Sequence, residues 1–130
     1  NGVQIAGHVK VNEYAIIGGG TLVHQFVKIG EHSMIAGGSL IRKDVPPFCK
    51  AGKEPLSYRG VNSIGLKRRD FSSDQINQIQ NIYRILYLEG RNNSQAIEKI
   101  EKDIPKSKEK NIVLNFIKNS ERGIIKGLLD

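Results

Sequence analysis

Cysteine, aromatic side chains and long apolar runs are all scarce in this 130-residue sequence. The single cysteine, Cys49, excludes an internal disulfide framework and fits a reducing, cytoplasmic compartment. No apolar run approaches the roughly 18 residues that a membrane-spanning helix needs, so we expect no transmembrane segment. No secretory signal is visible, and the sequence starts at Asn1 inside a patterned region, so we expect further chain upstream.

The basic charge of the sequence is spread out. The net charge is +7, and neither half of the chain contains a long basic block. A surface that binds nucleic acid needs a clustered basic face, and one for single strands commonly adds stacking aromatics, which make up only 6% here. We therefore expect no nucleic-acid partner. The charge favours anionic ligands such as phosphates, or an acidic partner protein.

What the sequence does contain is an aliphatic residue at every sixth position of its first third. All seven are β-branched: Ile5, Val11, Ile17, Val23, Ile29, Ile35 and Ile41. Two positions before each stands a small or β-branched residue: Val3, Val9, Ala15, Thr21, Val27, Ser33 and Ser39. Neither helical spacing nor strand alternation explains this period. A period of six is typical of a parallel β-helix, in which three six-residue units form one coil of 18.

The second half of the chain has a different pattern. Pro46 and Pro47 lack the amide hydrogen that strand pairing needs, so residues 43–71 are expected to form an exit loop with at most one short strand. Helical periodicity then predicts three helices. The first has Ser72 or Ser73 as its N-cap and Gly90 as its C′ stop; the second is capped by Ser94 and ends near Pro105; the third covers 108–119. Residues 120–129 are expected to form a short helical turn or a tail.

These patterns together define the expected fold class. It is a left-handed parallel β-helix of hexapeptide repeats, followed by a small α-helical C-terminal domain. We place the coils and the exit loop at 1–66 and the helical domain at 67–130. Two coils and a little more are too few to bury a continuous core alone, which again predicts missing coils upstream.

Three features could carry chemistry, and each has a plain structural interpretation. "IGGGTL" lacks the Gly-Lys-Ser/Thr of a phosphate loop and does not match a dinucleotide fingerprint, so its glycines are interpreted as turn residues. His8 and His24 are nearly one coil apart, but no third metal ligand is evident, and with His32 they are interpreted as surface-corner histidines. "GLKRR" is either solvated charge or a phosphate clamp presented by a loop.

Several motifs together resemble one enzyme family. "AGHV", "IIGG-T-VHQF--IG-H-M", "DVPP" and "GVN--GLKRR-F" are similar to the UDP-N-acetylglucosamine O-acyltransferases, across essentially this whole chain. The resemblance implies transfer of a 3-hydroxyacyl chain from acyl carrier protein to the 3-hydroxyl of UDP-N-acetylglucosamine, the first step of lipid A synthesis. It also implies a cytoplasmic homotrimer of Gram-negative bacteria. No cofactor is implied beyond the carrier-protein thioester as co-substrate.

The resemblance also assigns roles to residues. His8 would line the cleft between subunits and support catalysis, His24 and Gln25 would contact substrate, and Gly37 would limit acyl-chain length. The residues implied to hold the nucleotide or the carrier protein are Asn62, Arg68 and Arg69. The general-base histidine and its acidic partner would precede Asn1, so this segment alone is expected to be inactive. Ile64 stands where the family commonly has Glu, so one polar contact is expected to be absent or replaced.

Two alternatives stay open from the sequence. The repeats also suit a hexapeptide acyltransferase that uses coenzyme A and a different acceptor. They suit equally a non-catalytic trimeric module that only binds partners.

Overall fold

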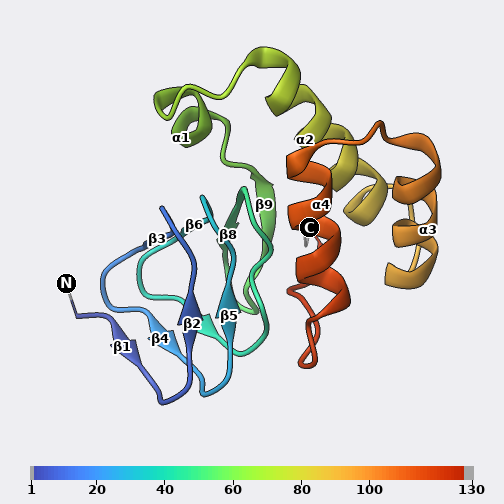
Figure 1. Ribbon diagram of the computed structural model, residues 1–130. Helices are drawn as coiled ribbons and strands as arrows, with labels where there is room; N and C mark the ends of the chain where they lie inside the picture. The colour runs from blue at the N-terminus through green and yellow to red at the C-terminus, as the bar shows by residue number, and fades with distance from the viewer. Residues whose placement is uncertain (1, 128–130) are drawn as a thin grey trace.

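The computed structural model describes residues 2–127, which form short strands followed by helices (Figure 1). The strands are β1 (Gln4–Ile5), β2 (Lys10–Val11), β3 (Ile16–Ile17), β4 (Leu22–Val23), β5 (Lys28–Ile29), β6 (Met34–Ile35), β7 (Leu40–Ile41), β8 (Cys49–Gly52) and β9 (Ser57–Val61). The helices are α1 (Ser63–Arg68), α2 (Ser73–Tyr87), α3 (Asn93–Asp103) and α4 (Lys108–Lys118).

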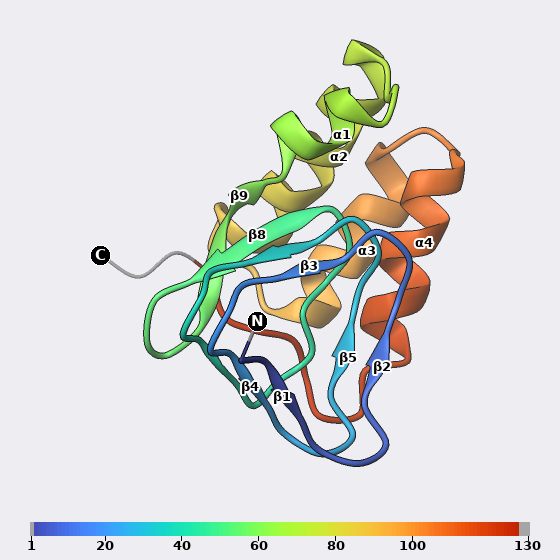
Figure 2. The same cartoon turned by 90° about the vertical axis from the view of Figure 1, so that its left-hand side faces the viewer.

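The short strands wind into a three-sided β-helix. Strands in successive coils pair in parallel with partners 18 residues apart, as Gln4 does with Leu22 and Lys10 with Lys28. The three resulting sheets have the orders β1-β4-β7, β2-β5 and β3-β6-β8-β9. Seen from the N-terminal end, the chain turns anticlockwise as it recedes, which makes the coil left-handed (Figure 2). The predicted period of six and coil of 18 are therefore confirmed.

The aliphatic residue of each six-residue unit forms the interior column of the prism. Its later members are at most 3% exposed: Val23, Ile29, Ile35 and Ile41. Burying a side chain of this size stabilises the fold by about 1.5–3 kcal/mol. Ile5 and Val11 are 51% and 41% exposed, because β1 and β2 form the end face of the prism and no described coil covers them.

The β-helix continues past Pro46 and Pro47, so the prediction that these prolines end strand pairing is wrong. Val45 bridges Ile29 in parallel, and β8 pairs in parallel with β6. The partners in this last coil are 16 residues apart instead of 18. The coil has therefore lost two residues, and a count of six from Ile41 passes over the next inward position, Val45.

Pro46 fits because of its place in the coil. In earlier coils the equivalent amide donates to the coil that follows, as the Gly30 amide does to the Val45 carbonyl at 2.7 Å. Among the described residues no further coil follows Val45 on this side, so the amide hydrogen that Pro46 lacks would have no strand partner. Proline at such an edge position costs no ladder hydrogen bond.

The predicted exit loop is also wrong in the segment that follows. β9 pairs antiparallel with β8, and α1 comes directly after it, so residues 43–71 contain two strands and a helix. The "GLKRR" motif therefore lies in α1 and its C-cap instead of in a loop. Lys67 and Arg68 occupy the last turn of α1, where a positive charge is favoured by the helix dipole.

The three later helices are confirmed, with corrections at their ends. Ser72 caps α2 in a capping box with Gln75. α2 has its C-cap at Leu88, so Glu89 occupies the C′ position and Gly90, the predicted C′ residue, lies one position further on. α3 is capped by Asn92 instead of Ser94, because the Asn92 side chain accepts the Gln95 amide and forms its own capping box.

Residues 120–126 return to the β-helix and form neither a helical turn nor a free tail. Ile124 bridges Asp44 in parallel, and Lys126 bridges Ser57. The carboxylate of Asp44, which is 1% exposed, accepts the Lys28 amide at 2.8 Å and the Ser120 hydroxyl at 2.6 Å. Leu128 and Leu129, the last residues of the predicted turn or tail, lie outside the described residues.

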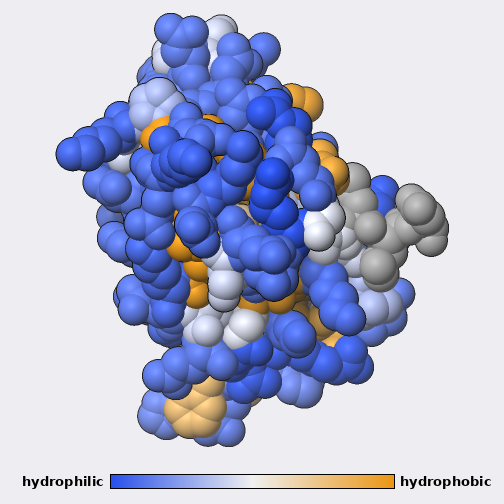
Figure 3. Space-filling view, turned by 90° about the vertical axis from the view of Figure 1, so that its right-hand side faces the viewer, coloured by the Kyte–Doolittle hydropathy of each residue, from blue (hydrophilic) through white to orange (hydrophobic). Residues whose placement is uncertain are grey.

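The helices pack on the last coil through α2. Its inward residues continue the core of the β-helix: Ile76, Ile79, Ile82, Tyr83, Ile85 and Leu86. The Tyr83 hydroxyl donates to the Pro47 carbonyl, and the Tyr58 ring of β9 stacks on Tyr83 and Tyr87 at 5.4 and 4.6 Å. Seen from the side of α3 and α4, the surface is mostly hydrophilic (Figure 3). In the described range, no helix combines the length and apolarity that crossing a membrane requires.

Candidate functional site at the corners of the β-helix

The corner turns of the β-helix share one four-residue frame. The third residue of each regular turn has a positive φ: Gly2, His8, Tyr14, Gly20, Phe26, His32, Gly38 and Phe48. The shortened turn between Ile41 and Val45 is the exception. The side chain of the fourth residue can brace the turn by donating to the carbonyl of the first. Ser33 donates to Gly30 at 2.7 Å, Ser39 to Ala36 at 2.6 Å, and Cys49 to Pro46 at 3.2 Å.

The three corners differ in the side chains that this frame presents. One, which we call the glycine corner, consists of Gly2, Gly20 and Gly38. The second, the ring corner, consists of Tyr14, His32 and Phe48. The third, the His8 corner, carries His8 stacked on Phe26 with 5.1 Å between ring centroids. Glycine is therefore not what the turn requires, since rings adopt the same positive φ in the same place.

At the ring corner, the imidazole of His32 is enclosed by aromatic rings. It stacks on Tyr14 at 4.9 Å and on Phe48 at 5.8 Å, and the Phe71 ring meets it edge-on at 5.1 Å. His32 is 7% exposed, so the prediction of a surface-corner histidine is wrong for this residue. The Asn62 side chain holds its backbone by donating to the His32 carbonyl at 3.0 Å.

Within residues 2–127, the one polar side-chain contact found for the His32 ring is with Arg69. The Arg69 Nη1 atom lies 3.1 Å from His32 Nδ1. A guanidinium can only donate, so Nδ1 is the acceptor and the proton of a neutral ring resides on Nε2. Burial lowers the pKa of His32 below its ordinary 6.5, and the charges of Arg69 and Lys108 lower it further, against an opposing effect of Glu13. The ring is therefore neutral at neutral pH.

Arg69 also lies over the face of Tyr14, with 5.4 Å from its guanidinium carbon to the ring centroid. A cavity of about 450 Å³ opens beside it, lined by the ring-corner side chains together with Glu13, Glu31, Phe71 and residues of α4. Its charged members are Glu13, Glu31, Arg69, Lys108 and Glu109. Burial raises the pKa of Glu31 above its ordinary value. The cavity is thus lined by aromatic rings on one part of its wall and by acidic and basic side chains on the rest.

The predicted substrate contacts His24 and Gln25 lie just before Phe26, at the His8 corner. All three of His8, His24 and Gln25 are exposed, so for His8 and His24 the surface position is confirmed. Arg122 ties the C-terminal segment to this turn. Its side chain donates to the Gln25 carbonyl and to the Arg42 carbonyl, each at 3.0 Å.

Gly37 lies beside the glycine corner and is exposed. A Cβ at Gly37 would come within 3.0 Å of the Gly19 carbonyl oxygen, so a side chain there would crowd the neighbouring coil. Gly18 is more constrained, since its Cβ would lie 2.3 Å from the Gly37 amide nitrogen. The three consecutive glycines thus belong to corner geometry, as the sequence indicated.

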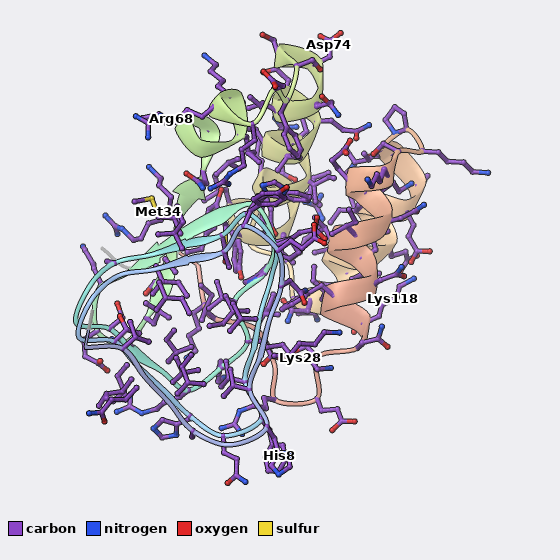
Figure 4. The ribbon with its side chains drawn as sticks, turned by 60° about the vertical axis from the view of Figure 1, so that its left-hand side comes forward. His8, Lys28, Met34, Arg68, Asp74 and Lys118 are labelled. Atoms are coloured by element: carbon purple, nitrogen blue, oxygen red, sulfur yellow. The ribbon has the colours of Figure 1, made fainter. Side chains whose placement is uncertain are left out.

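Within one chain, the predicted site residues do not converge. His8, His24 and Gln25 lie at one corner, Asn62 and Arg69 at the ring corner, and Gly37 near the glycine corner. Arg68 is exposed on α1, on the opposite side of the prism from His8 (Figure 4). Asn62 is 3% exposed, and a Cβ at Gly65 would meet its amide within 2.6 Å, so a glycine at 65 makes room for it.

The sequence analysis did not predict that His32 lies in a stack of aromatic rings and contacts Arg69. The available signal was its distance of one coil from Tyr14, which places the two rings one above the other. Phe48 was hidden because the shortened coil puts it 16 residues after His32.

The comparisons with known proteins identify the class. Residues 44–125 match the family described as UDP N-acetylglucosamine O-acyltransferase, domain 2. The chain is 41% identical over 126 residues to the acyl-[acyl-carrier-protein]–UDP-N-acetylglucosamine O-acyltransferase of Thiobacillus denitrificans, covering 97% of this chain and 49% of that protein. It is 39% identical over 127 residues to the enzyme of the same name from Stenotrophomonas maltophilia strain R551-3, covering 97% and 48%.

Solved structures agree with this. The crystal structure of LpxA, a UDP-N-acetylglucosamine acyltransferase from Bacteroides fragilis, matches with a TM-score of 0.95 and 46% identity, over 97% of this chain and 49% of that one. The Francisella novicida UDP-N-acetylglucosamine acyltransferase matches with a TM-score of 0.92 and 36% identity, over 97% and 46%. The chain belongs to the UDP-N-acetylglucosamine O-acyltransferase family, and it spans about half the length of the curated relatives it matches.

Proposed function

We propose that this chain is the C-terminal part of an enzyme that transfers a 3-hydroxyacyl group from acyl carrier protein to the 3-hydroxyl of UDP-N-acetylglucosamine, the first step of lipid A biosynthesis. The observation that carries the proposal is the 41% identity to an acyltransferase of that name over 97% of the chain. We place the enzyme in the cytoplasm of a Gram-negative bacterium. Its co-substrate is the carrier-protein thioester, and no cofactor enters the proposal.

The chemistry needs a base that takes the proton of the sugar hydroxyl as the oxygen attacks the thioester carbonyl. It also needs donors for the oxyanion that develops. We assign the base to none of the described residues, because the family resemblance places it in coils that precede "AGHV". The described residues would instead form walls of the site, with His8, His24 and Gln25 facing substrate and Asn62, Arg68 and Arg69 facing the nucleotide or the carrier protein.

These residues lie at different corners of one chain, so they could form one site only if different copies of the chain contribute to it. A homotrimer would allow this. In a three-sided prism, a site built between two copies can take one corner from each. Support comes from three apolar side chains that project from the two faces meeting at the glycine corner. Ile16, Leu22 and Met34 are 44–45% exposed there. Exposed apolar patches of this kind mark contact surfaces.

Activity of the complete enzyme tests the proposal. Transfer of a 3-hydroxyacyl group from carrier protein to radiolabelled UDP-N-acetylglucosamine is expected, with coenzyme A thioesters used far less well. Preference for coenzyme A would support a different hexapeptide acyltransferase, and no affinity for either substrate would support a binding module. Residues 1–130 alone should give no turnover. Light scattering of the complete enzyme should give the mass of three copies.

The proposed role of Gly37 has its own test. In the complete enzyme, Gly37→Met should shift preference toward shorter acyl donors, because its side chain would project beside the glycine corner. Gly38→Met is the control of equal side-chain length, since a Cβ at Gly38 meets no atom within 4 Å and its cost is limited to the positive φ of 73°. An unchanged chain-length preference in Gly37→Met, with a folded protein, would remove Gly37 from the site.

A further inference from the structure

We propose that His32 is a positioning residue that holds the Arg69 guanidinium, still fully charged, at the mouth of the ring-corner cavity, ready for a phosphate-bearing ligand. This rests on the proposed function, which assigns Arg69 to the phosphates of the nucleotide or of the carrier protein's prosthetic group. Nothing in the family resemblance gave His32 a role.

Arg69 needs an anchor if its guanidinium is to stay in one position. It is the C-cap residue of the six-residue helix α1, and beyond the cap the chain leaves the helix. In the part of the chain that the structure describes, its guanidinium has one cation–π contact, with the face of Tyr14, and one hydrogen-bond contact, with Nδ1 of His32. Immobilising a long side chain before a ligand arrives lowers the entropy cost of binding.

His32 differs from the usual anchor of an arginine side chain. An arginine is most often held by a carboxylate, which cancels its charge. Among the ion pairs found in the described range, none includes Arg69. The imidazole of His32 is a neutral acceptor, so it fixes one N–H of the guanidinium while the positive charge and the other four N–H groups stay free for an anion.

The His32 ring is itself held in place by its neighbours. Tyr14 and Phe48 hold its ring from both faces, Phe71 from the edge, and Asn62 binds its carbonyl. Binding geometry is preserved when the residue behind a contact is itself locked by packing and hydrogen bonds. Because His32 is held in place, the Arg69 guanidinium bonded to it is also restricted to one position.

Acid should break the contact between His32 and Arg69. A protonated His32 would carry a hydrogen on Nδ1 facing Arg69, which removes the acceptor and adds repulsion. The charged groups facing the ring are Arg69, Lys108 and Glu13, and the first two oppose protonation. Phosphate binding through Arg69 should therefore weaken as the pH falls below the ordinary histidine range.

The test uses the complete enzyme and two phosphate probes, UDP and 4′-phosphopantetheine, titrated separately by calorimetry at pH 7.5. The two probes distinguish a nucleotide phosphate from a carrier phosphate. Arg69→Met should weaken the relevant probe about tenfold or more, as expected for loss of a charge-assisted contact. His32→Phe should weaken the same probe about three- to tenfold, because Arg69 is released instead of removed.

The chain supplies matched variants for this experiment. Phe26 and Phe48 adopt φ of 66° and 67° at equivalent positions, so His32→Phe keeps the turn and the ring stack and removes only the acceptor. His32→Asn offers an amide oxygen and tolerates positive φ, so it should recover part of the affinity. His32→Phe combined with Arg69→Met should be no weaker than Arg69→Met alone.

The outcomes separate the two proposals. If Arg69→Met weakens a probe and His32→Phe binds it like the wild type, the positioning role is overturned and the proposed function stands. If Arg69→Met changes neither probe, the assignment of Arg69 falls, and the role of His32 with it. A pH series from 8 to 5 adds a further readout: the wild type should lose more affinity than His32→Phe, since ionisation of the probe itself affects both equally.

Discussion

The glycine corner and the ring corner have the same backbone conformation but differ in the side chains at the third turn position. Their turns share the positive φ of the third residue and the side-chain brace from the fourth, seen in Ser39 and Ser33. At one corner nothing lies within 4 Å of where a Cβ at Gly38 would be. At the other, His32 at the equivalent position is enclosed by rings and bonded to Arg69.

This difference shows which positions of the six-residue repeat require a particular type of residue and which positions accept many types. The period fixes the inward aliphatic residue and the turn, so these must be present at every corner. The residue at the third turn position points away from the prism, so its identity can vary. It can be a glycine, which leaves the corner without a side chain, or a residue such as His32, which binds another side chain. The following predictions test how far that separation holds.

The largest loss of stability is expected at Gly18 and Gly30, where the backbones of neighbouring coils lie very close together at the two corners. A Cβ at Gly18 would lie 2.3 Å from the Gly37 amide nitrogen, and one at Gly30 would lie 2.4 Å from the Pro47 nitrogen. Gly18→Ala and Gly30→Ala should each lower the free energy of unfolding by about 3 kcal/mol, because backbone atoms must move apart. Urea unfolding at a fixed protein concentration measures this. A wild-type midpoint in either variant would show that the coils can separate locally.

An exchange of residues between the corners should be asymmetric. His32→Gly removes a buried ring and the acceptor for Arg69, and should cost about 2 kcal/mol of unfolding free energy. Gly38→His should cost only about 1 kcal/mol, for the positive φ of a residue with a side chain. Both values come from the same urea experiment. Equal costs would mean that the ring stack adds no stability.

The two corners should also differ in their response to pH. The pKa of His32 in the folded chain lies below its ordinary 6.5, so the unfolded chain binds more protons in mild acid. The stability that depends on neutral His32 is thus present above about pH 6.5 and is lost as the pH falls below it. The wild type should lose more stability than His32→Phe between pH 7 and 5. Parallel pH curves for the two proteins would contradict this.

The smallest effect is expected at the brace that both corners share. Cys49→Ser should change the free energy of unfolding by about 1 kcal/mol or less, since serine serves as the brace in the turns of Ser33 and Ser39. Burial raises the pKa of the Cys49 thiol, so iodoacetamide should modify the native protein very slowly and the unfolded chain quickly. Rapid labelling under native conditions would show that the last coil opens.

The sequence predicted the regular part of the fold well, because a period of six has few structural explanations. It failed where the period changed. The loss of two residues between Ile41 and Val45 hid the two remaining sides of the last coil, at Val45 and in β8, and the two prolines favoured the wrong prediction of a loop. Only the pairing of Val45 with Ile29 shows that a proline here stands at an edge and costs nothing.

The candidate site was predictable only in part. "VHQF" and "GLKRR" pointed to His24, Gln25, Arg68 and Arg69, and the family resemblance could name them. The contact between His32 and Arg69 joins residues from the β-helix and from the end of α1, 37 positions apart. No local pattern encodes such a contact, because it depends on how α1 leaves the last coil.

The return of residues 120–126 has a consequence for the order in which the chain becomes native during synthesis. The buried Asp44 carboxylate receives the Ser120 hydroxyl from 76 residues further along. The ribosome makes the coils first and this partner last, at about 5–20 residues per second. For several seconds of each round of translation, the Asp44 carboxylate therefore has the Lys28 amide but not the Ser120 hydroxyl as a donor, and the last coil lacks its pairing with residues 124–126.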